Sequence, residues 1–126
     1  MRDFTRLKTW QRAHELTLAV YRATERLPEE ERFGLRLQLR RACASIPTNI
    51  AEGCGRSTDA DFGRFLAFSA GSATETEYLL VLARDLGFIG ASASTGLLRS
   101  TREVKKMLFA LMKRVSSASD EQTGNG

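Results

Sequence analysis

The chain of 126 residues is poor in the side chains on which metal and nucleophilic chemistry usually depend. It has one histidine, His14, and two cysteines, Cys43 and Cys54. A dimetal carboxylate site in a helical bundle needs Glu-x-x-His pairs on two helices, so a single histidine argues against that site. The cysteines have neither metal-ligand spacing nor the histidine and aspartate partners of a nucleophilic thiol. We therefore expect no catalytic residue, no metal site and no cofactor, and we expect that the protein is not an enzyme.

Long apolar runs are also missing. No segment approaches the roughly 20 apolar residues of a membrane-spanning helix, and residues 1–16 lack the apolar run of a signal peptide. Two cysteines on one straight helix are too far apart to form a disulfide, and reduced, buried thiols are typical of cytosolic proteins. We expect a cytoplasmic protein with no membrane partner. Nothing in the sequence indicates a small-molecule substrate.

What the sequence does contain is helical periodicity, without strand-like alternation. Apolar residues recur every three or four positions in four segments, which predicts four helices. The first helix is expected over Leu7–Leu27, and the second from Pro28 to the glycines at 53–55. The third is expected to begin with a cap at Ser57, Thr58 or Asp59 and to end at Leu86. The fourth is expected to begin at Ser92 or Ser94 and to end at Val115. Four helices with short connections fold as an antiparallel bundle. The sequence predicts an all-α, single up-and-down four-helix bundle over residues 1–115 and a disordered polar tail over residues 116–126.

The second of these segments has a proline near its middle and a polar face. Pro47 removes a helical hydrogen bond and clashes with the carbonyl of Cys43, which costs about 3 kcal/mol and predicts a kink. The face opposite the apolar one is rich in Ser, Thr, Asn and Gln. Three interpretations fit this face: a solvated surface, a subunit interface, or a binding surface for nucleic acid or protein. We favour the interface, for which the candidate residues are Gln38, Arg41, Ser45, Asn49, Glu52 and Arg56.

Two further segments have more apolar surface than a monomer needs. The first and third helices are apolar around more than a third of their circumference. The third also has a small-residue patch over residues 70–73. A second apolar face on a bundle helix indicates burial against another subunit, although a thick core would also explain it. We expect the protein to have itself as a partner, in a homo-oligomer.

Basic residues are segregated within a chain of net charge +4. The fourth segment has six basic residues against Glu103 alone from Arg99 to Arg114, whereas the third is net acidic. Helical spacing predicts one solvent-facing stripe that suits a phosphate backbone. Its members are Arg99, Arg102, Lys106 and Lys113, with Arg36 and Arg40 of the second segment as secondary candidates. The alternative is a solvated face that only keeps the protein soluble.

Several motifs resemble a known family. They are ERFGL at 31–35, QLRRA at 38–42, SIPTNIAEGCGR at 45–56, TWQRAHEL at 9–16, the segment 62–89 and VKKMLFAL at 104–111. They resemble the four-helix-bundle proteins encoded in 23S rRNA intervening sequences, also labelled S23 ribosomal proteins, and the similarity covers Phe4 to about Val115. The resemblance implies a small bundle that assembles as a ring-like homo-oligomer, a pentamer, with a link to RNA. It brings no catalytic residues.

The leading hypothesis is therefore a non-enzymatic, homo-oligomeric protein that binds RNA or another nucleic acid through its basic faces. The alternative is a protein-interaction scaffold in which the charge has no nucleic-acid role. A third hypothesis is an enzyme active at a subunit junction, for which the sequence supplies no nucleophile or base.

Overall fold

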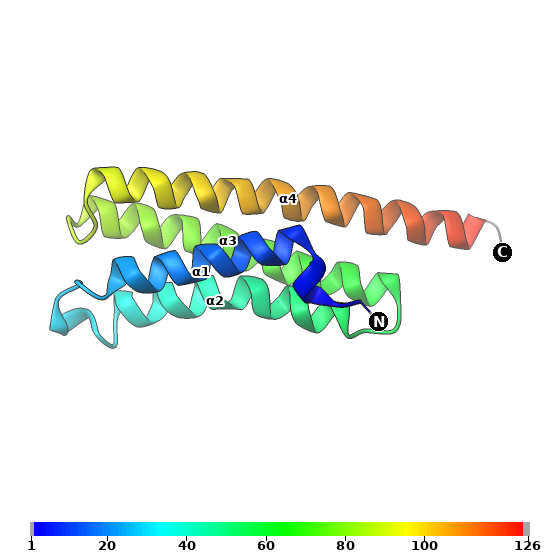
Figure 1. Ribbon diagram of the computed structural model, residues 1–126, viewed down its shortest axis with the longest axis horizontal. Coiled ribbons are helices and arrows are strands. Elements are labelled where there is room, and N and C mark those ends of the chain that lie inside the picture. Colours follow the sequence, from blue (N-terminus) through cyan, green and yellow to red (C-terminus); the bar gives the residue numbers. More distant parts are fainter. Residues whose placement is uncertain (1, 125–126) are drawn as a thin grey trace.

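The computed structural model describes residues 2–124, with side-chain environments for residues 2–118, and helices are the only regular secondary structure in this range. Four α-helices are present: α1 (Lys8–Thr24), α2 (Leu35–Cys54), α3 (Asp59–Asp85) and α4 (Ala91–Gly124). Two short 3-10 helices, η1 (Phe4–Arg6) and η2 (Glu29–Glu31), flank α1. The helices lie side by side with alternating direction, and α4 extends beyond the other three (Figure 1). The prediction of an all-α, up-and-down four-helix bundle is confirmed.

Each helix packs against two neighbours in the described part of the chain. α1 packs on α2 and α4, and α3 packs on α2 and α4. The helices therefore occupy the corners of a square in cross-section, and the α1/α4 and α2/α3 pairs form opposite sides of the bundle. The α1–α2 and α3–α4 connections lie at one end, and the α2–α3 connection lies at the other with the N-terminus (Figure 1).

The core is built from the apolar faces that periodicity predicts. Fully buried side chains come from all four helices and include Val20, Leu39, Ile46, Ile50, Leu66, Leu80, Val104 and Leu108. The α2–α3 contact is especially close at Gly53. A Cβ atom there would lie 2.9 Å from Cδ1 of Phe62 and 3.0 Å from Cβ of Phe65. Because those separations are too short for carbon atoms, glycine allows the two helices to approach.

Helix α2 passes through Pro47 as one continuous helix. The missing N–H leaves the carbonyl of Cys43 without its ordinary helical donor. The single hydroxyl proton of Thr17 on α1 is shared between the carbonyl of Ala13, at 2.8 Å, and the carbonyl of Cys43, at 3.4 Å. A neighbouring helix thus partly replaces the lost bond. The predicted kink at Pro47 stays a prediction.

Three helix boundaries differ from those expected. α1 ends at Thr24, not at Leu27. Pro28 begins only the short η2, and α2 starts separately at Leu35, where the carboxylate of Glu31 accepts the backbone N–H at 2.9 Å. A proline followed by glutamates suits any helical turn, so these residues cannot specify that the turn continues into α2.

The third difference is at the end of α4. The sequence predicts that this helix ends at Val115, whereas α4 continues through Gly124. The predicted disorder of the tail over residues 116–126 stays a prediction. Residues 116–123 contain neither proline nor glycine, and polar composition alone does not end a helix. Residues 125–126 lie outside the described part of the chain.

Candidate nucleic-acid interface

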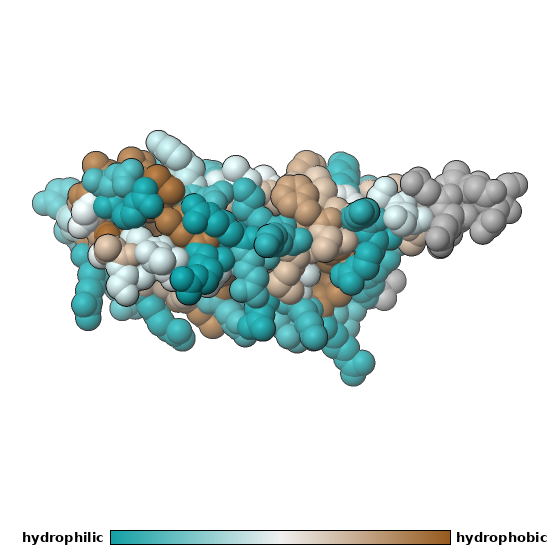
Figure 2. Space-filling view, turned by 90° about the horizontal axis from the view of Figure 1, so that it is seen from above, coloured by the Kyte–Doolittle hydropathy of each residue, from teal (hydrophilic) through white to brown (hydrophobic). Residues whose placement is uncertain are grey.

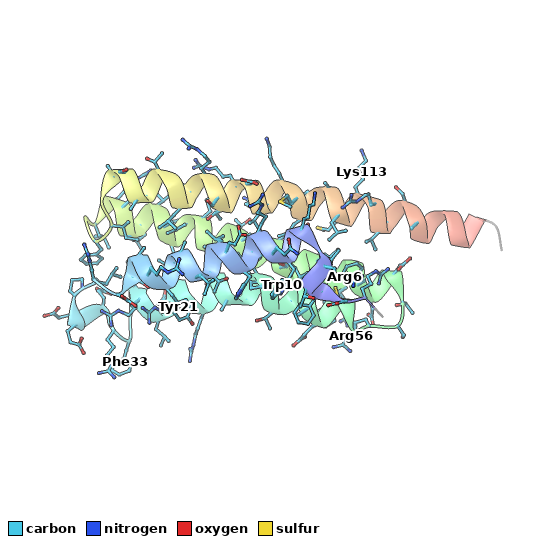
Figure 3. The ribbon with its side chains drawn as sticks, viewed as in Figure 1. Arg6, Trp10, Tyr21, Phe33, Arg56 and Lys113 are labelled. Atoms are coloured by element: carbon cyan, nitrogen blue, oxygen red, sulfur yellow. The ribbon has the colours of Figure 1, made fainter. Side chains whose placement is uncertain are left out.

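The basic stripe lies along the outward face of α4. Arg99, Arg102, Lys106 and Lys113 are all exposed, while Val104 and Leu108 on the opposite face of the helix are buried. In Figure 3, Lys113 points away from the other helices. Arg99, Lys106 and Lys113 form no ion pair with any described side chain. Their charge is therefore available to a partner.

An exposed aromatic residue lies within this stripe. Phe109 is 54% exposed and comes three positions after Lys106 and four before Lys113, so helical spacing places it beside both. Sequence reasoning missed it. The available signal was that Phe109 falls outside the apolar spacing of Val104, Leu108 and Leu111.

Arg102 is bound to the neighbouring helix. Its Nε donates to Oε2 of Glu77 on α3 at 2.7 Å, and Nζ of Lys105 donates to Oε1 at 2.9 Å. The hydrogen bond from Arg102 lowers the pKa of Glu77 most, and the hydrogen bond from Lys105 lowers it further. The carboxylate partly neutralises this section of α4 and joins it to α3. Next to Glu77 in the sequence, Tyr78 is a second exposed aromatic residue.

The secondary candidates lie elsewhere, at the junction of α1 and α2. Nη2 of Arg36 donates to the carbonyl of Leu27 at 2.7 Å. Nε of Arg40 donates to the hydroxyl of Thr24 at 2.9 Å, and its guanidinium lies 4.6 Å from the ring centroid of Tyr21. Arg40 thus binds the last turn of α1 and Arg36 binds the connection just after it, where carbonyls lack helical partners. They are joined to α1 and do not extend the α4 stripe.

The polar face of α2 lies along α3. The hydroxyls of Ser45 and Ser72 are 2.7 Å apart, and Nδ2 of Asn49 donates to both oxygens of Ser45 at 2.9 Å. The guanidinium of Arg56 lies 4.5 Å from the ring centroid of Phe65. The other candidate residues, Gln38, Arg41 and Glu52, are exposed on the same helix. That these six residues form a subunit interface stays a prediction.

The two cysteines are free, buried thiols. Burial raises the pKa of Cys43 to about 11, partly opposed by a hydrogen bond with Thr17. Burial also raises the pKa of Cys54, which the charge of Arg2 opposes. Both thiols are therefore protonated at neutral pH, the form that is a poor nucleophile. The single histidine, His14, stacks on Trp10 with ring centroids 5.0 Å apart.

The described residues contain no group of three or more His, Cys, Asp or Glu side chains that could hold a metal ion. Among the described helices, none has the length and apolar character needed to cross a membrane.

Residues 5–110 match the family model described as 23S rRNA-intervening sequence protein. The chain belongs to this family. A similar solved structure is the crystal structure of a protein of unknown function from the S23 ribosomal protein family of Bacteroides thetaiotaomicron. It is 25% identical in sequence and has a TM-score of 0.75, over 83% of this chain and 98% of that chain. No curated protein matches the chain. The family resemblance read from the sequence motifs is thus confirmed.

Proposed function

We propose that this protein is a non-enzymatic homo-oligomer that binds RNA, or another nucleic acid, through the outward face of α4. The observation that carries the proposal is the set of unpaired, exposed cations with an exposed phenylalanine among them, namely Arg99, Lys106, Phe109 and Lys113. An exposed ring adds nothing to solubility, and this one lies between two unpaired cations. Cations that follow a phosphate backbone and rings on which bases stack are the two components of single-strand binding surfaces.

The family description names 23S rRNA, which makes RNA the first nucleic acid to test. Assembly supports the same function physically. If several copies associate, as the pentameric ring implied by the resemblance would require, the α4 stripe is repeated once per copy. Repetition raises the local positive potential and converts weak single contacts into multivalent binding.

The alternative function is a protein-interaction scaffold without a nucleic-acid role. Large exposed apolar side chains such as Phe33 and Leu86, which lie outside the basic stripe, favour it. The salt dependence of the binding affinity distinguishes the two functions. Phosphate contacts lose affinity steeply as the salt concentration rises, because the release of counterions from the nucleic acid becomes less favourable, whereas an apolar protein contact does not.

The test is fluorescence anisotropy with labelled single-stranded and double-stranded RNA and DNA at about 50 and about 200 mM salt. We expect sub-micromolar binding at the lower salt and a steep loss at the higher. Lys106→Ala combined with Lys113→Ala should weaken binding by about tenfold or more and reduce the salt slope by up to about two phosphate contacts. The matched control is Arg6→Ala combined with Arg32→Ala, which removes the same charge from exposed positions on η1 and on the α1–α2 connection. Absence of binding at the lower salt, or equal loss in the control, would contradict the proposal.

A further inference from the structure

Two contacts fix how α3 and α4 lie alongside each other. Near the start of α3, a Cβ atom on Gly63 would lie 3.9 Å from Cγ1 of Val115 on α4. Four helical turns further along α3, Oε1 of Glu77 accepts from Nζ of Lys105 at 2.9 Å. The two helices are antiparallel, so the residues between these contacts lie opposite one another in reverse order.

Phe109 lies midway along this part of α4, level with residue 70 of α3. It is 54% exposed, and it follows Lys105 by one turn on the edge of α4 that faces α3. The facing edge of α3, one, two and three turns before Glu77, has only small side chains, which are Thr74, Ala70 and Ala67. A Cβ atom on the neighbouring Gly71 would have no atom within 4 Å. The ring of Phe109 thus has open space and no large side chain of α3 opposite it.

The surface around this ring is basic. The segments 63–74 and 105–115 contain neither aspartate nor glutamate, whereas their basic residues are Arg64, Lys105, Lys106, Lys113 and Arg114. Lys106 and Lys113 are exposed, form no ion pair with any described side chain, and lie one turn before and one turn after Phe109. Seen from the α4 side, a hydrophobic patch lies among hydrophilic side chains near the middle of the molecule (Figure 2). Apolar surface is therefore available between free cations.

A single-stranded nucleic acid offers the two groups that fit this surface. Its phosphates attract the ammonium groups, and its unpaired bases have flat faces that stack on aromatic rings. In a duplex the bases stack on one another, and double-stranded RNA is contacted mainly at its phosphates and 2′-hydroxyls. An exposed phenylalanine between two lysines can therefore contribute to the binding of a single strand and adds little to the binding of a duplex.

We infer that an unpaired base of a single-stranded RNA stacks on Phe109, with the phosphates before and after that nucleotide bound by Lys106 and Lys113. The inference rests on the proposed function and names single-stranded RNA as the substrate class of the same surface. The two lysines are about 10 Å apart along α4, and their flexible side chains can bring both ammonium groups to successive phosphates. Every base has a face that can stack, so binding should depend little on sequence.

Anisotropy titrations with a single-stranded RNA, and with the same RNA annealed to its complement, test this contact. Phe109→Leu keeps an apolar side chain and removes the ring. It should weaken binding of the single strand by about 5- to 100-fold, which corresponds to the loss of one stacked base, and leave binding of the duplex unchanged. The salt slope for the single strand should stay the same, because the substitution removes no charge.

Two further variants serve as rescue and control. Phe109→Trp keeps an aromatic ring, so it should bind the single strand as tightly as the wild type. Stacking of a base should also quench the emission of the new indole, whereas the emission of Trp10, the single tryptophan of the wild type, should change less. The matched control is Phe33→Leu, the same substitution at a phenylalanine that is 79% exposed on the α1–α2 connection, and it should bind like the wild type.

The outcomes separate this inference from the proposed function. Absence of binding of either RNA to the wild type at low salt would contradict the proposed function, and the stacking contact with it. Single-strand binding that Phe109→Leu leaves unchanged would reject only the stacking contact and retain binding through the cations. Equal weakening of single strand and duplex by Phe109→Leu, the same weakening by Phe33→Leu, or a wild type that prefers the duplex would also reject it. Circular dichroism of each variant establishes that it is folded.

Discussion

Pro47 shows how one residue in a helix depends on a residue of its neighbour. Proline has no N–H, so the carbonyl of Cys43 must find a donor outside α2 or stay unpaired among buried side chains. The hydroxyl of Thr17 is the group that α1 supplies there, at 3.4 Å. Leaving a buried carbonyl unpaired costs about 1–3 kcal/mol, whereas the net gain from a paired one is smaller. The proline in α2 and the threonine in α1 should therefore be energetically coupled.

A double-mutant cycle measures this coupling. Thr17→Val keeps the shape of the side chain and removes the donor, and we expect it to lower the free energy of unfolding by about 1–2 kcal/mol. In a Pro47→Ala background, the new backbone N–H can bond to Cys43, so the same substitution should cost less by about 0.5–1 kcal/mol. Urea unfolding of the four proteins gives the coupling energy. Thr48→Val, on an exposed residue whose hydroxyl bonds only to Ala44 within α2, is the control. Equal costs of Thr17→Val in both backgrounds would contradict the coupling.

Among the helices, Glu77 determines how α3 and α4 share charge. Its pKa is lowered by hydrogen bonds from Arg102 and Lys105. A carboxyl whose pKa is lower in the folded than in the unfolded protein stabilises the fold above the unfolded pKa. That stabilisation is lost as the pH falls through the lowered, folded pKa. Because Arg102 is largely exposed, solvent screens the pair and its contribution to stability is modest.

The prediction for Glu77→Gln follows from the same geometry. Removing the carboxylate charge releases Arg102 and Lys105, so RNA affinity at low salt should rise several-fold and the salt slope should steepen. The free energy of unfolding should fall by about 1 kcal/mol or less at pH 7, and part of the wild type's loss of stability in acid should disappear. Anisotropy titrations and urea unfolding at pH 7 and in acid provide the two measurements. Glu30→Gln makes the same charge change at an exposed, unpaired residue. An identical gain in RNA affinity for that variant would show that the change in net charge explains the gain, and that the release of Arg102 and Lys105 does not.

How far the sequence predicts these helices depends on whether the determining contact is local. Apolar periodicity is local, so the four helices, their core faces and the outward stripe of α4 could all be predicted. The end of α1 and the start of α2 could not, because they depend on partners distant in sequence. Arg36 bonds to the carbonyl of Leu27, nine residues away and just after α1, and Arg40 bonds to the carbonyl of Tyr21 in α1, nineteen residues away. In the sequence, each is only a basic residue on a polar face, and so was a candidate for phosphate.

The candidate site shows the same limit. Spacing along one helix places Arg99, Lys106 and Lys113 together, and it could also have placed Phe109 among them. It could not reveal that Arg102 is bound to Glu77, since that ion pair joins residues 25 apart on different helices. The open space beside Phe109 was likewise invisible, because the small residues of α3 lie opposite that ring only when α3 and α4 are neighbours.

For the molecule as a whole, the distribution of surfaces matters more than any single one. The bundle has its candidate subunit interface along α2 and its cations with Phe109 on α4. A monomer of 126 residues and net charge +4 can offer an RNA only a few phosphate contacts. An assembly offers the same few contacts many times, and a long RNA can occupy several at once.

Affinity for RNA should therefore depend on assembly only when the RNA is long. If Asn49→Ala in the candidate subunit interface gives a monomer, we expect that variant to bind a long single-stranded RNA more weakly than the wild type by about 10²-fold or more, with a smaller salt slope, because multivalency is lost. A short RNA that spans one α4 stripe should bind both proteins equally, since Asn49 lies on α2, outside the stripe. Anisotropy with RNAs of increasing length, at fixed salt, gives the length at which the two proteins diverge. Equal weakening on the short RNA would show instead that the polar face of α2 itself contacts RNA, and equal affinity at all lengths would show that each copy binds alone.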